Sequence, residues 1–598
     1  MLYPIHNHFR SIINLNGLWQ FDLDPDNSGV KKGWMQDPPG ERIIGVPGSW
    51  NDQFTDTHIY FKTAWYSKDL FIPENLRQHS LLLRIADANN HLTAYVNGQK
   101  IGEHAFGFLP ALLEINSAVK FGANNRIVLK IDSIFERDTL PQWGRGIGHW
   151  AGTVMHADYF PYAGLNRDVV LWSVPPVRLH NLKVDTLLSK DHKKGILKIK
   201  FWFKGLPDRV SVVLQEKNGR VVMQGQQEIK NNEGLLELSI RNPRLWSPES
   251  PYLYKLQVFT LKEGVPQDEY NLPVGLRTIS VTRDQVLLNG RPIFLRGFSR
   301  HEDFPVIGRG HVDALMVREF SLMKWLGANS FRTSHYPYDE RQYQLADELG
   351  FLVIDEAPVV SFFWIKSNFY TSKKTFDWNR VYSKKLETLH RQSLNEMMAR
   401  DWNHPSVIAW SVSNESDGTS RQANGYFKRI CEYTRGIDST RMVVHTNCGD
   451  MGDGLHNDIS HQHCDMICLN HYDFAYNNEG RNNQPVIEKL ERKLRDAKAR
   501  FRKPIMLTEF GMCGIPGQHS LAPEYFTEEG QLEHVFLYLD VAKKLPFVVG
   551  THLWNLKDFK TQEHSARAYL NFKGAFTRLM EPKLLAHMLK KRWEKSRC

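Results

Sequence analysis

The chain has 598 residues, which is too long for one hydrophobic core and, at about 150 residues per domain, suggests three or four folding units; we expect three. Its hydrophobic content of 41% and charged content of 24% are ordinary for globular proteins, and no window approaches 18 consecutive apolar residues, so the composition argues against a disordered chain and a membrane span. The formal charge is +10, but the basic residues are scattered and often neighbour acids, as in KLERKLRDAKARFRK. This distribution is typical of a solvated surface, so we predict no nucleic-acid and no membrane partner. The positive charge is compatible with an anionic substrate.

The first part of the chain alternates apolar and polar residues in short runs, which is the period of β-strands. The opening MLYPIHNHFRSIINLNGLW has no charged start followed by an apolar stretch, so no secretion signal is predicted. In SLLLRIADANNHLTAYVNGQKIGEH, Asn97 and Gly98 are a strong signal for a two-residue hairpin. Paired prolines at Pro175 and Pro176 cannot lie in a central strand, and we therefore expect a β-sandwich that ends there.

Further short strands follow from Lys183 to about Val274, in GILKIKFWFKG, VSVVLQEKNGRVVMQG and YLYKLQVFTL. Asn218 and Gly219 indicate another hairpin. A length of about 100 residues suits an immunoglobulin-like sandwich.

After Gly275, short apolar runs alternate with longer segments of helical period, such as VDALMVREFSLMKWLGA and DERQYQLADELG. The runs are PIFLRGFSR, NSFRTSHYP, FLVIDEAP, SVIAWSVSNE, RMVVHTNC, MICLNHYD, PIMLTEFG and FVVGTHLWN. Eight strands with intervening helices predict a (β/α)₈ TIM barrel. An open doubly wound sheet is the alternative, but no Gly-rich phosphate turn follows the first strand.

All six cysteines lie in the C-terminal third, whereas a disulfide framework would be spread along the chain, so free thiols are expected. The segment SHQHCDMIC has zinc-ligand residue types but no second ligand pair at finger spacing. We therefore predict no metal and no cofactor.

Catalytic groups of a barrel lie at the carboxyl ends of its strands, so the residues after each apolar run are the informative ones. Those residues are Arg300, His301, Glu302, Asp303, Ser334, His335, Asp355, Glu356, Asn414, Glu415, His471, Tyr472, Glu509, Trp554 and Asn555. Carboxylates, imidazoles, amides and aromatic rings without a serine-triad order, a thiolate setting or a phosphate loop point to carbohydrate chemistry.

Cleavage of a glycosidic bond requires one carboxylic acid that protonates the leaving oxygen and one carboxylate that attacks or activates water. Glu415 and Glu509 end the fourth and seventh runs and therefore face each other across the barrel mouth. Asn414 is placed to hold the sugar 2-hydroxyl. A strand-end acid by itself is as often a helix cap or an Arg partner, and we give that structural role to Asp355 and Glu356.

The motifs SVSNE around Glu415 and LTEFG around Glu509 resemble the acid/base and nucleophile motifs of glycoside hydrolase family 2, and FRTSHYPY and LVIDE extend the match. The resemblance covers nearly the whole chain. The resemblance implies a jelly-roll sugar-binding domain at 1–176, an immunoglobulin-like sandwich at 177–275 and a catalytic TIM barrel at 276–598. It also implies retention of configuration, with Glu509 as nucleophile and Glu415 as acid/base, and carboxyl groups about 5 to 5.5 Å apart.

In NFKG, Asn571 and Lys573 resemble the Asn-x-Lys motif by which family members that act on β-glucuronides recognise the substrate carboxylate, and Arg567 matches a further carboxylate-binding position. A fixed ammonium with an amide donor makes charge-assisted bonds that a neutral hydroxymethyl group cannot match. The implied activity is hydrolysis of β-D-glucuronides. A β-galacturonidase or dual uronidase is the alternative; a neutral-sugar β-galactosidase and a carbohydrate-binding protein with an inactive barrel fit less well.

The same resemblance implies sugar-binding or supporting roles for other residues. They are His301 and His335 for sugar hydroxyls, Asn470, Tyr472 and Tyr476 for support of the nucleophile and the uronate, Trp554 for the pocket floor, and Asp158 for a contact from the first domain. The sequence departs from the family at Ser416, where proline is frequent, and at Phe510, where tyrosine is usual. The loop over the aglycone, 359–376, varies within the family and leaves the leaving-group preference open.

Asn414, Glu415 and Ser416 form a glycosylation sequon, and a glycan there would block the proposed site. A bacterial cytoplasmic enzyme is therefore expected, with a periplasmic location left open. We also expect a homo-oligomer of two or four chains.

Overall fold

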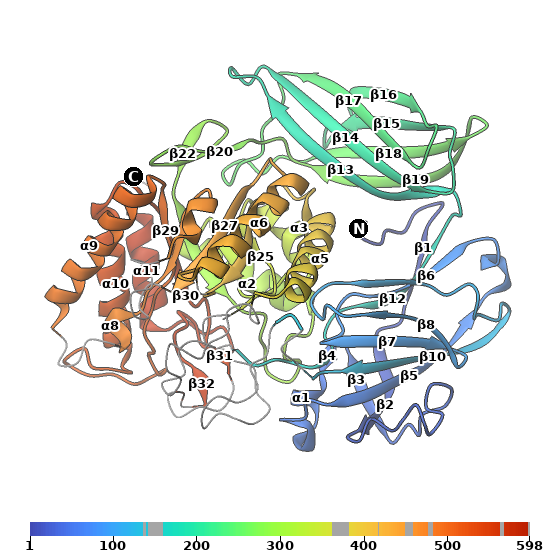
Figure 1. Cartoon of the computed structure of the whole chain (residues 1–598), viewed down its shortest axis with the longest axis horizontal. Coiled ribbons are helices and arrows are strands. Elements are labelled where there is room, and N and C mark those ends of the chain that lie inside the picture. Colours follow the sequence, from blue (N-terminus) through green and yellow to red (C-terminus); the bar gives the residue numbers. More distant parts are fainter. Residues whose placement is uncertain are drawn as a thin grey trace.

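The computed structural model describes residues 1–134, 139–141, 159–360, 382–416, 418–448, 458–476, 482–561, 567 and 569–595. Figure 1 shows two lobes built of strands and one lobe in which helices surround a barrel. The first β lobe and the barrel lie beside each other, and the second β lobe lies above both in that view.

The first lobe is a sandwich of two antiparallel sheets. One sheet contains β3 (Arg42–Val46), β2 (Gly17–Asp24), β5 (Thr63–Ile72), β10 (Ala123–Asp132), β7 (His91–Val96) and β8 (Gln99–His104), in that order. The other contains β1 (Ser11–Asn14), β12 (Val169–Val174), β6 (Ser80–Ile85) and β9 (Ala111–Glu114). Short elements beside them are β4 (Gly48–Ser49), α1 (Trp50–Gln53), η1 (Thr55–Thr57), η2 (Glu74–Leu76) and β11 (Gly164–Leu165). Side chains such as Phe21, Leu83 and Ile127 form its core.

The predicted Asn-Gly hairpin of this lobe is confirmed. Val96 at the end of β7 pairs with Gln99 at the start of β8, and Asn97 and Gly98 between them have φ of 51° and 80°. Two consecutive positive φ values define a type I′ turn, which Asn-Gly adopts with little strain.

The second lobe is a smaller sandwich. Its sheets are β13 (Arg178–Leu188), β14 (Lys194–Lys204) and β17 (Glu233–Arg241), and β16 (Val221–Glu228), β15 (Arg209–Gln215), β18 (Tyr254–Lys262) and β19 (Val265–Val274). The hairpin expected at Asn218 and Gly219 joins β15 to β16, but Gln215 pairs with Val221, so the connection is longer than two residues. Burial along β14 alternates residue by residue, as one face packs on the core.

The third lobe is a closed parallel barrel, and the open doubly wound alternative is wrong. Its strands are β23 (Leu295–Arg300), β24 (Ser330–Thr333), β25 (Leu352–Glu356), β26 (Val407–Asn414), β27 (Met442–Cys448), β28 (Ile467–Asn470), β29 (Ile505–Glu509) and β30 (Val548–Trp554). Each strand lies within one of the eight apolar runs, and β30 pairs with β23 to close the ring. A small sheet of β20 (Ile279–Val281), β21 (Val286–Leu288) and β22 (Arg291–Ile293) precedes it. Val286 of that sheet shares a core with Leu295 and Met506, at the amino ends of barrel strands.

Helices cover the outside of the barrel in Figure 1. They are α2 (Asp313–Leu326), α3 (Glu340–Leu349), α5 (Lys384–Asp401), α6 (Arg421–Ile437), α9 (Asn483–Phe501), α10 (Glu528–Lys544) and α11 (Leu584–Glu594). Shorter elements near the barrel are η3 (Ser460–His463), α8 (Asp473–Tyr476), β31 (Phe559–Lys560) and β32 (Leu570–Asn571). The Asp339 side chain accepts a hydrogen bond from Arg341 N at the start of α3, and Gly350, with φ of 73°, ends that helix.

The first lobe packs directly on the barrel. Phe108 stacks on Tyr336 with ring centroids 4.5 Å apart, and Phe106, Phe108 and Tyr159 belong to the same buried cluster as the barrel residues. The barrel is therefore partly covered, at the carboxyl end of β24, by side chains from outside it.

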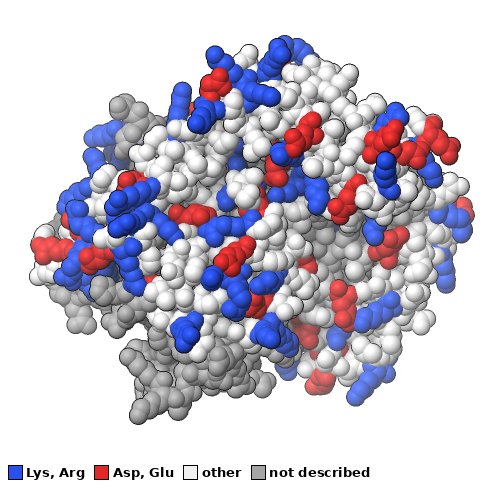
Figure 2. All heavy atoms as spheres, turned by 45° about the horizontal axis from the view of Figure 1, so that its top comes forward, with Lys and Arg blue, Asp and Glu red and all other residues white. Residues whose placement is uncertain are grey.

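The described helices include none that is long and apolar enough to cross a membrane. Each of the five cysteines within the described residues is a free thiol. On the face shown in Figure 2, Lys and Arg side chains are spread over the surface with Asp and Glu among them.

Candidate active site

The buried carboxylate of Glu509, at the end of β29, lies at the centre of a polar cluster. Tyr472 donates its hydroxyl to Oε2 (2.8 Å), and the Arg332 guanidinium donates to Oε1. Nε2 of His335 is 3.7 Å from the same Oε1. Burial raises the pKa of Glu509 above its ordinary value, although Arg332 and His335 offset part of that effect; the charge of Glu415 raises it further.

Glu415 follows β26 and points toward the same cluster. Its Oε1 accepts a hydrogen bond from Nδ2 of Asn470 (3.0 Å), and that nitrogen is also 3.1 Å from Oδ1 of Asn414. The backbone of Asn470 in β28 is in register with that of Glu509 in β29, so the residue that bonds to Glu415 lies on the strand next to Glu509. Glu415 has φ of 48°, a left-handed conformation that costs about 1 kcal/mol or more in a residue with a Cβ, while its backbone N–H donates to Thr446 O (2.9 Å).

Arg332 is the main site residue that sequence reasoning missed. It lies in β24, fully buried, and donates to Oε2 of Glu356 (2.8 Å) as well as to Glu509. Its Nη1 is also 3.1 Å from Oδ1 of Asn414. An arginine inside a predicted barrel strand, which is covered on both faces, was the available signal, because a buried charge requires partners.

Glu356 has the structural role expected of it, as a partner of Arg332. Burial would raise the pKa of its carboxyl, but Arg332 and His335 outweigh burial and lower that pKa, so Glu356 remains anionic. Oε1 of Glu356 accepts from Nδ1 of His335 (2.8 Å), which leaves Nε2 of His335 on the side of Glu509.

The predicted histidines and tryptophan form a second wall of the cluster. His335 stacks on Trp554 with ring centroids 5.1 Å apart, and His301 meets Trp554 edge to face at 5.0 Å. Nδ1 of His301 is 3.3 Å from the Tyr336 hydroxyl, and its buried Nε2 has no hydrogen-bond partner in the described part of the chain. Burial, with neighbouring positive charges, lowers the pKa of His301, so the ring is neutral and can bond to a hydroxyl group.

Two of the predicted carboxylate-binding residues, Asn571 and Lys573, lie next to this cluster. Asn571 ends β32 and, like Lys573, is buried; its Oδ1 accepts from Lys573 N (3.1 Å). Nζ of Lys573 is 4.7 Å from the ring centroid of Tyr472, the residue that donates to Glu509. The ammonium and the nucleophile candidate therefore both contact the same tyrosine. Arg567 is half-buried, and its carbonyl accepts from Tyr569 N (3.1 Å).

Some expectations fall outside the described residues. They are Asp158, the side chain of Tyr476, and the part of the 359–376 loop from residue 361 onward.

Three sequence models of one family match consecutive parts of the chain. They describe the sugar binding domain of glycosyl hydrolases family 2 (residues 12–175), a further family 2 domain (177–277) and the family 2 TIM barrel domain (279–597). The chain belongs to glycoside hydrolase family 2. It is therefore a glycoside hydrolase, and the predicted fold class of two sandwiches and a TIM barrel is confirmed.

Relatives within the family match over the full length. The chain is 34% identical to a Beta-glucuronidase of Paenibacillus borealis, covering 99% of this chain and 98% of the relative, and 33% identical to a Beta-glucuronidase of Felis catus, covering 100% and 92%. The crystal structure of Ruminococcus gnavus beta-glucuronidase superposes with a TM-score of 0.91 at 34% identity, covering 99% of both chains. The same enzyme in complex with D-glucuronic acid gives 0.90 at 33% identity, again covering 99% of both chains.

Proposed function

We propose that this enzyme is a retaining β-glucuronidase, which hydrolyses β-D-glucuronides to glucuronic acid and an aglycone. The observation that carries the proposal is the buried pair of Asn571 and Lys573 beside Tyr472, which itself binds Glu509. A cation fixed at this place meets a carboxylate at C6 of a sugar whose anomeric carbon faces the nucleophile. The full-length likeness to enzymes named beta-glucuronidase supports the same substrate.

In the proposed mechanism, Glu509 attacks the anomeric carbon while Glu415 protonates the aglycone oxygen, which forms a covalent glucuronyl-enzyme and releases the aglycone. Glu415 then takes a proton from water, and that water displaces Glu509 from the anomeric carbon. Arg332 and Tyr472 orient the nucleophile through the two bonds they donate to it. The carboxyl separation of about 5 to 5.5 Å required by this mechanism stays a prediction.

We base the remaining roles on the family likeness. Asn414 holds the sugar 2-hydroxyl, His301 and His335 bind other hydroxyls, and Trp554 forms the pocket floor. Asn470 holds Glu415 through a 3.0 Å hydrogen bond. Asp158, Tyr476 and Arg567 keep the binding roles that the family likeness implies for them.

A β-galacturonidase or a dual uronidase is the competing function. Asn571 and Lys573, which we call the carboxylate clamp, would bind the C6 carboxylate of either sugar and do not distinguish axial from equatorial C4 hydroxyls. A neutral-sugar β-galactosidase would bring no carboxylate that the ammonium of Lys573 could bind. An inactive carbohydrate-binding protein would not need both carboxylates and their donors.

The test compares hydrolysis of matched aryl β-glucuronide, β-galacturonide and β-galactoside by the wild type and Lys573→Ala. Loss of a charge-assisted bond to the substrate costs roughly 2 to 4 kcal/mol, so kcat/KM for the glucuronide should fall about 30- to 1000-fold relative to the galactoside. The control is Lys503→Ala, which removes a lysine away from the proposed site. Nζ of Lys503 bonds to the Gln462 carbonyl (2.8 Å), and Lys503 precedes β29, at the end of the strand opposite Glu509. An unchanged ratio of uronide to neutral-sugar hydrolysis in Lys573→Ala would show that the clamp is absent.

Domain limits at 176/177 and 275/276 are part of the proposal and are supported by the spans of the three family matches. A homo-oligomer of two or four chains, a cytoplasmic or periplasmic bacterial location, and the absence of nucleic-acid and membrane partners remain predictions from the sequence.

A further inference from the structure

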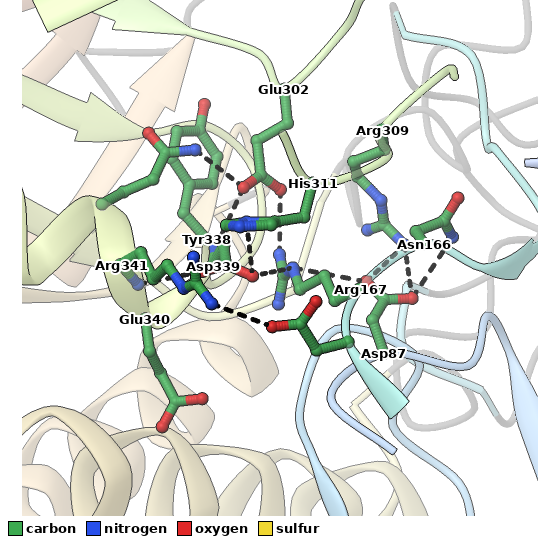
Figure 3. A network of polar contacts seen from close by, with 12 residues as sticks. Asp87, Asn166, Arg167, Glu302, Arg309, His311, Tyr338, Asp339, Glu340 and Arg341 are labelled. Atoms are coloured by element: carbon green, nitrogen blue, oxygen red, sulfur yellow. Dashed lines mark hydrogen bonds and ion pairs between the residues drawn. The ribbon is translucent and has the colours of Figure 1, made fainter. Parts of the chain in front are cut away.

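Arg167, in the turn between β11 and β12 of the first lobe, reaches across to the barrel. Its side chain is 1% exposed. Nη1 donates to the Phe108 carbonyl (2.9 Å) within its own lobe, and Nη2 donates to Oε2 of Glu302 and to the Pro337 carbonyl, both at 2.8 Å. Figure 3 shows the guanidinium of Arg167 close to Asp87, Glu302 and Asp339. One fork of donors is therefore shared between two lobes, a geometry that lysine cannot reproduce.

The two barrel partners of Arg167 belong to the loops that carry the candidate sugar-binding histidines. Glu302 directly follows His301, and Pro337 is two residues after His335. Oε1 of Glu302 accepts from Asp339 N (2.9 Å), so Glu302 also connects the loop after β23 to the loop after β24.

A second set of contacts connects the first lobe to His301. Phe108, whose carbonyl binds Arg167, stacks on Tyr336, and the Tyr336 hydroxyl is 3.3 Å from Nδ1 of His301. The guanidinium of Arg309 lies over the Phe108 ring (4.1 Å) and pairs with Asp87 of the first lobe at 2.8 Å. The first lobe therefore contacts both the loop segments and the aromatic ring that adjoin His301.

We propose that Arg167 is a positioning residue for the reaction: it holds the loops after β23 and β24 so that His301 and His335 meet the glucuronide hydroxyls. The inference rests on the proposed function, because it presumes that these histidines contact the sugar. Arg167 itself touches no reacting atom. It acts through the loop segments that it joins.

The first test is Arg167→Lys, which keeps the positive charge but loses the fork. A misplacement of about 1 Å at the reacting groups costs on the order of 100-fold, so we expect kcat/KM for an aryl β-glucuronide to fall about 10- to 100-fold. The inhibition constant of D-glucaro-1,5-lactone should rise by a similar factor. A role confined to folding would instead lower the thermal midpoint and leave both quantities unchanged at temperatures where the variant is folded.

Arg10→Lys is the matched control. Arg10 is also 1% exposed and pairs with Asp268 of the second lobe, donating from Nε at 2.8 Å, so its loss weakens a buried ion pair away from the histidines. We expect a lower thermal midpoint and unchanged kcat/KM. If Arg167→Lys fails to fold, Glu302→Gln tests the same contact from the barrel side, because it keeps the side-chain volume but removes the charge that Arg167 binds.

A double-mutant cycle separates positioning from general destabilisation. If Arg167 acts through His301, the loss in Arg167→Lys/His301→Ala is smaller than the product of the two single losses; independent effects multiply. Wild-type hydrolysis of the glucuronide is measured first, and failure there refutes the proposed function. An active wild type, together with unchanged kinetics in Arg167→Lys or independent effects in the cycle, refutes the positioning role alone.

Discussion

The side chain of Glu509 lies among groups that act on its pKa in opposite directions. Burial raises the pKa, and the charge of Glu415 adds to that increase. Arg332, His335 and the hydrogen bond from Tyr472 lower it, but the net pKa is above the ordinary value of 4.5. The nucleophile must be ionised to attack. The fall of kcat/KM at low pH, which is the acid limb of its pH profile, therefore reports this pKa in the free enzyme.

Replacing Tyr472 by Phe removes the hydroxyl that donates to Glu509 at 2.8 Å but keeps the ring near Lys573. With that donor gone, the pKa of Glu509 rises further, so we expect the acid limb of kcat/KM for an aryl β-glucuronide to move to higher pH. The control is Tyr538→Phe, which removes a hydroxyl bonded to Nδ1 of His471 (3.0 Å). A limb that stays in place or moves to lower pH in Tyr472→Phe contradicts this account of the site.

Most residues of the described cluster could be predicted from the sequence, because the side chains at the carboxyl ends of barrel strands lie together. Arg332 was missed because it lies inside a strand rather than at its end. Its buried charge is explained by Glu356 and Glu509, which are 24 and 177 residues away along the chain. Glu356 could be given a structural role but not a partner. Local sequence does not specify which distant carboxylate meets an arginine.

The barrel strands were predictable because both faces of each are covered, which makes them continuous apolar runs. The two-residue strands β31 and β32 were not, since they are too short to show a period, yet β32 places Asn571 in the site. Its pairing with β31 depends on a chain reversal that no local pattern encodes.

Close contact between neighbouring barrel strands depends on Gly297 in β23. A Cβ at this position would lie 1.7 Å from the Ser330 carbonyl oxygen of β24, with which Gly297 is in register. Gly297→Ala therefore forces the strands apart, and overpacking of this kind costs roughly 1 to 3 kcal/mol or more. We expect a lower thermal midpoint by calorimetry and reduced activity, because β23 leads to His301.

Gly436→Ala is the matched control for that substitution. Gly436 is exposed near the end of α6, and no atom lies within 4 Å of an added Cβ. Alanine in a helix is more favourable than glycine by about 0.5 to 1 kcal/mol, so the midpoint should rise slightly or stay the same. Equal midpoints for the two variants would mean that β23 and β24 tolerate the methyl group.

For the whole molecule, composition and motif order predicted the order of the lobes but not how they dock. The contacts between the first lobe and the barrel join residues such as Arg167 and Glu302, which are 135 positions apart. Each looks like an ordinary surface charge in its own segment. Their burial becomes visible only when both lobes are assembled, and the dependence of the histidine loops on Arg167 was therefore not accessible from the sequence.

His311 lies at the same junction, on the barrel side. Its backbone N–H donates to the Asn166 carbonyl of the first lobe (3.0 Å), and its ring pairs with Asp339 (3.3 Å) and Asp313 (3.1 Å). Burial lowers the pKa of the imidazole, but the bond and charge of Asp339, with a contribution from Asp168, outweigh burial, so the net pKa is raised. Arg341 acts in the opposite sense.

A histidine whose pKa is higher in the folded than in the unfolded chain stabilises the fold fully below its unfolded pKa, about 6.5, and loses that contribution as pH rises through the folded pKa. His311→Gln should therefore lower the thermal midpoint more at pH 6 than at pH 8.5. Calorimetric scans of both proteins across this range measure the effect, and subtracting variant from wild type removes the titration of the other histidines. A difference that is constant or grows with pH would mean that the ion pairs of protonated His311 with Asp339 and Asp313 do not stabilise the fold.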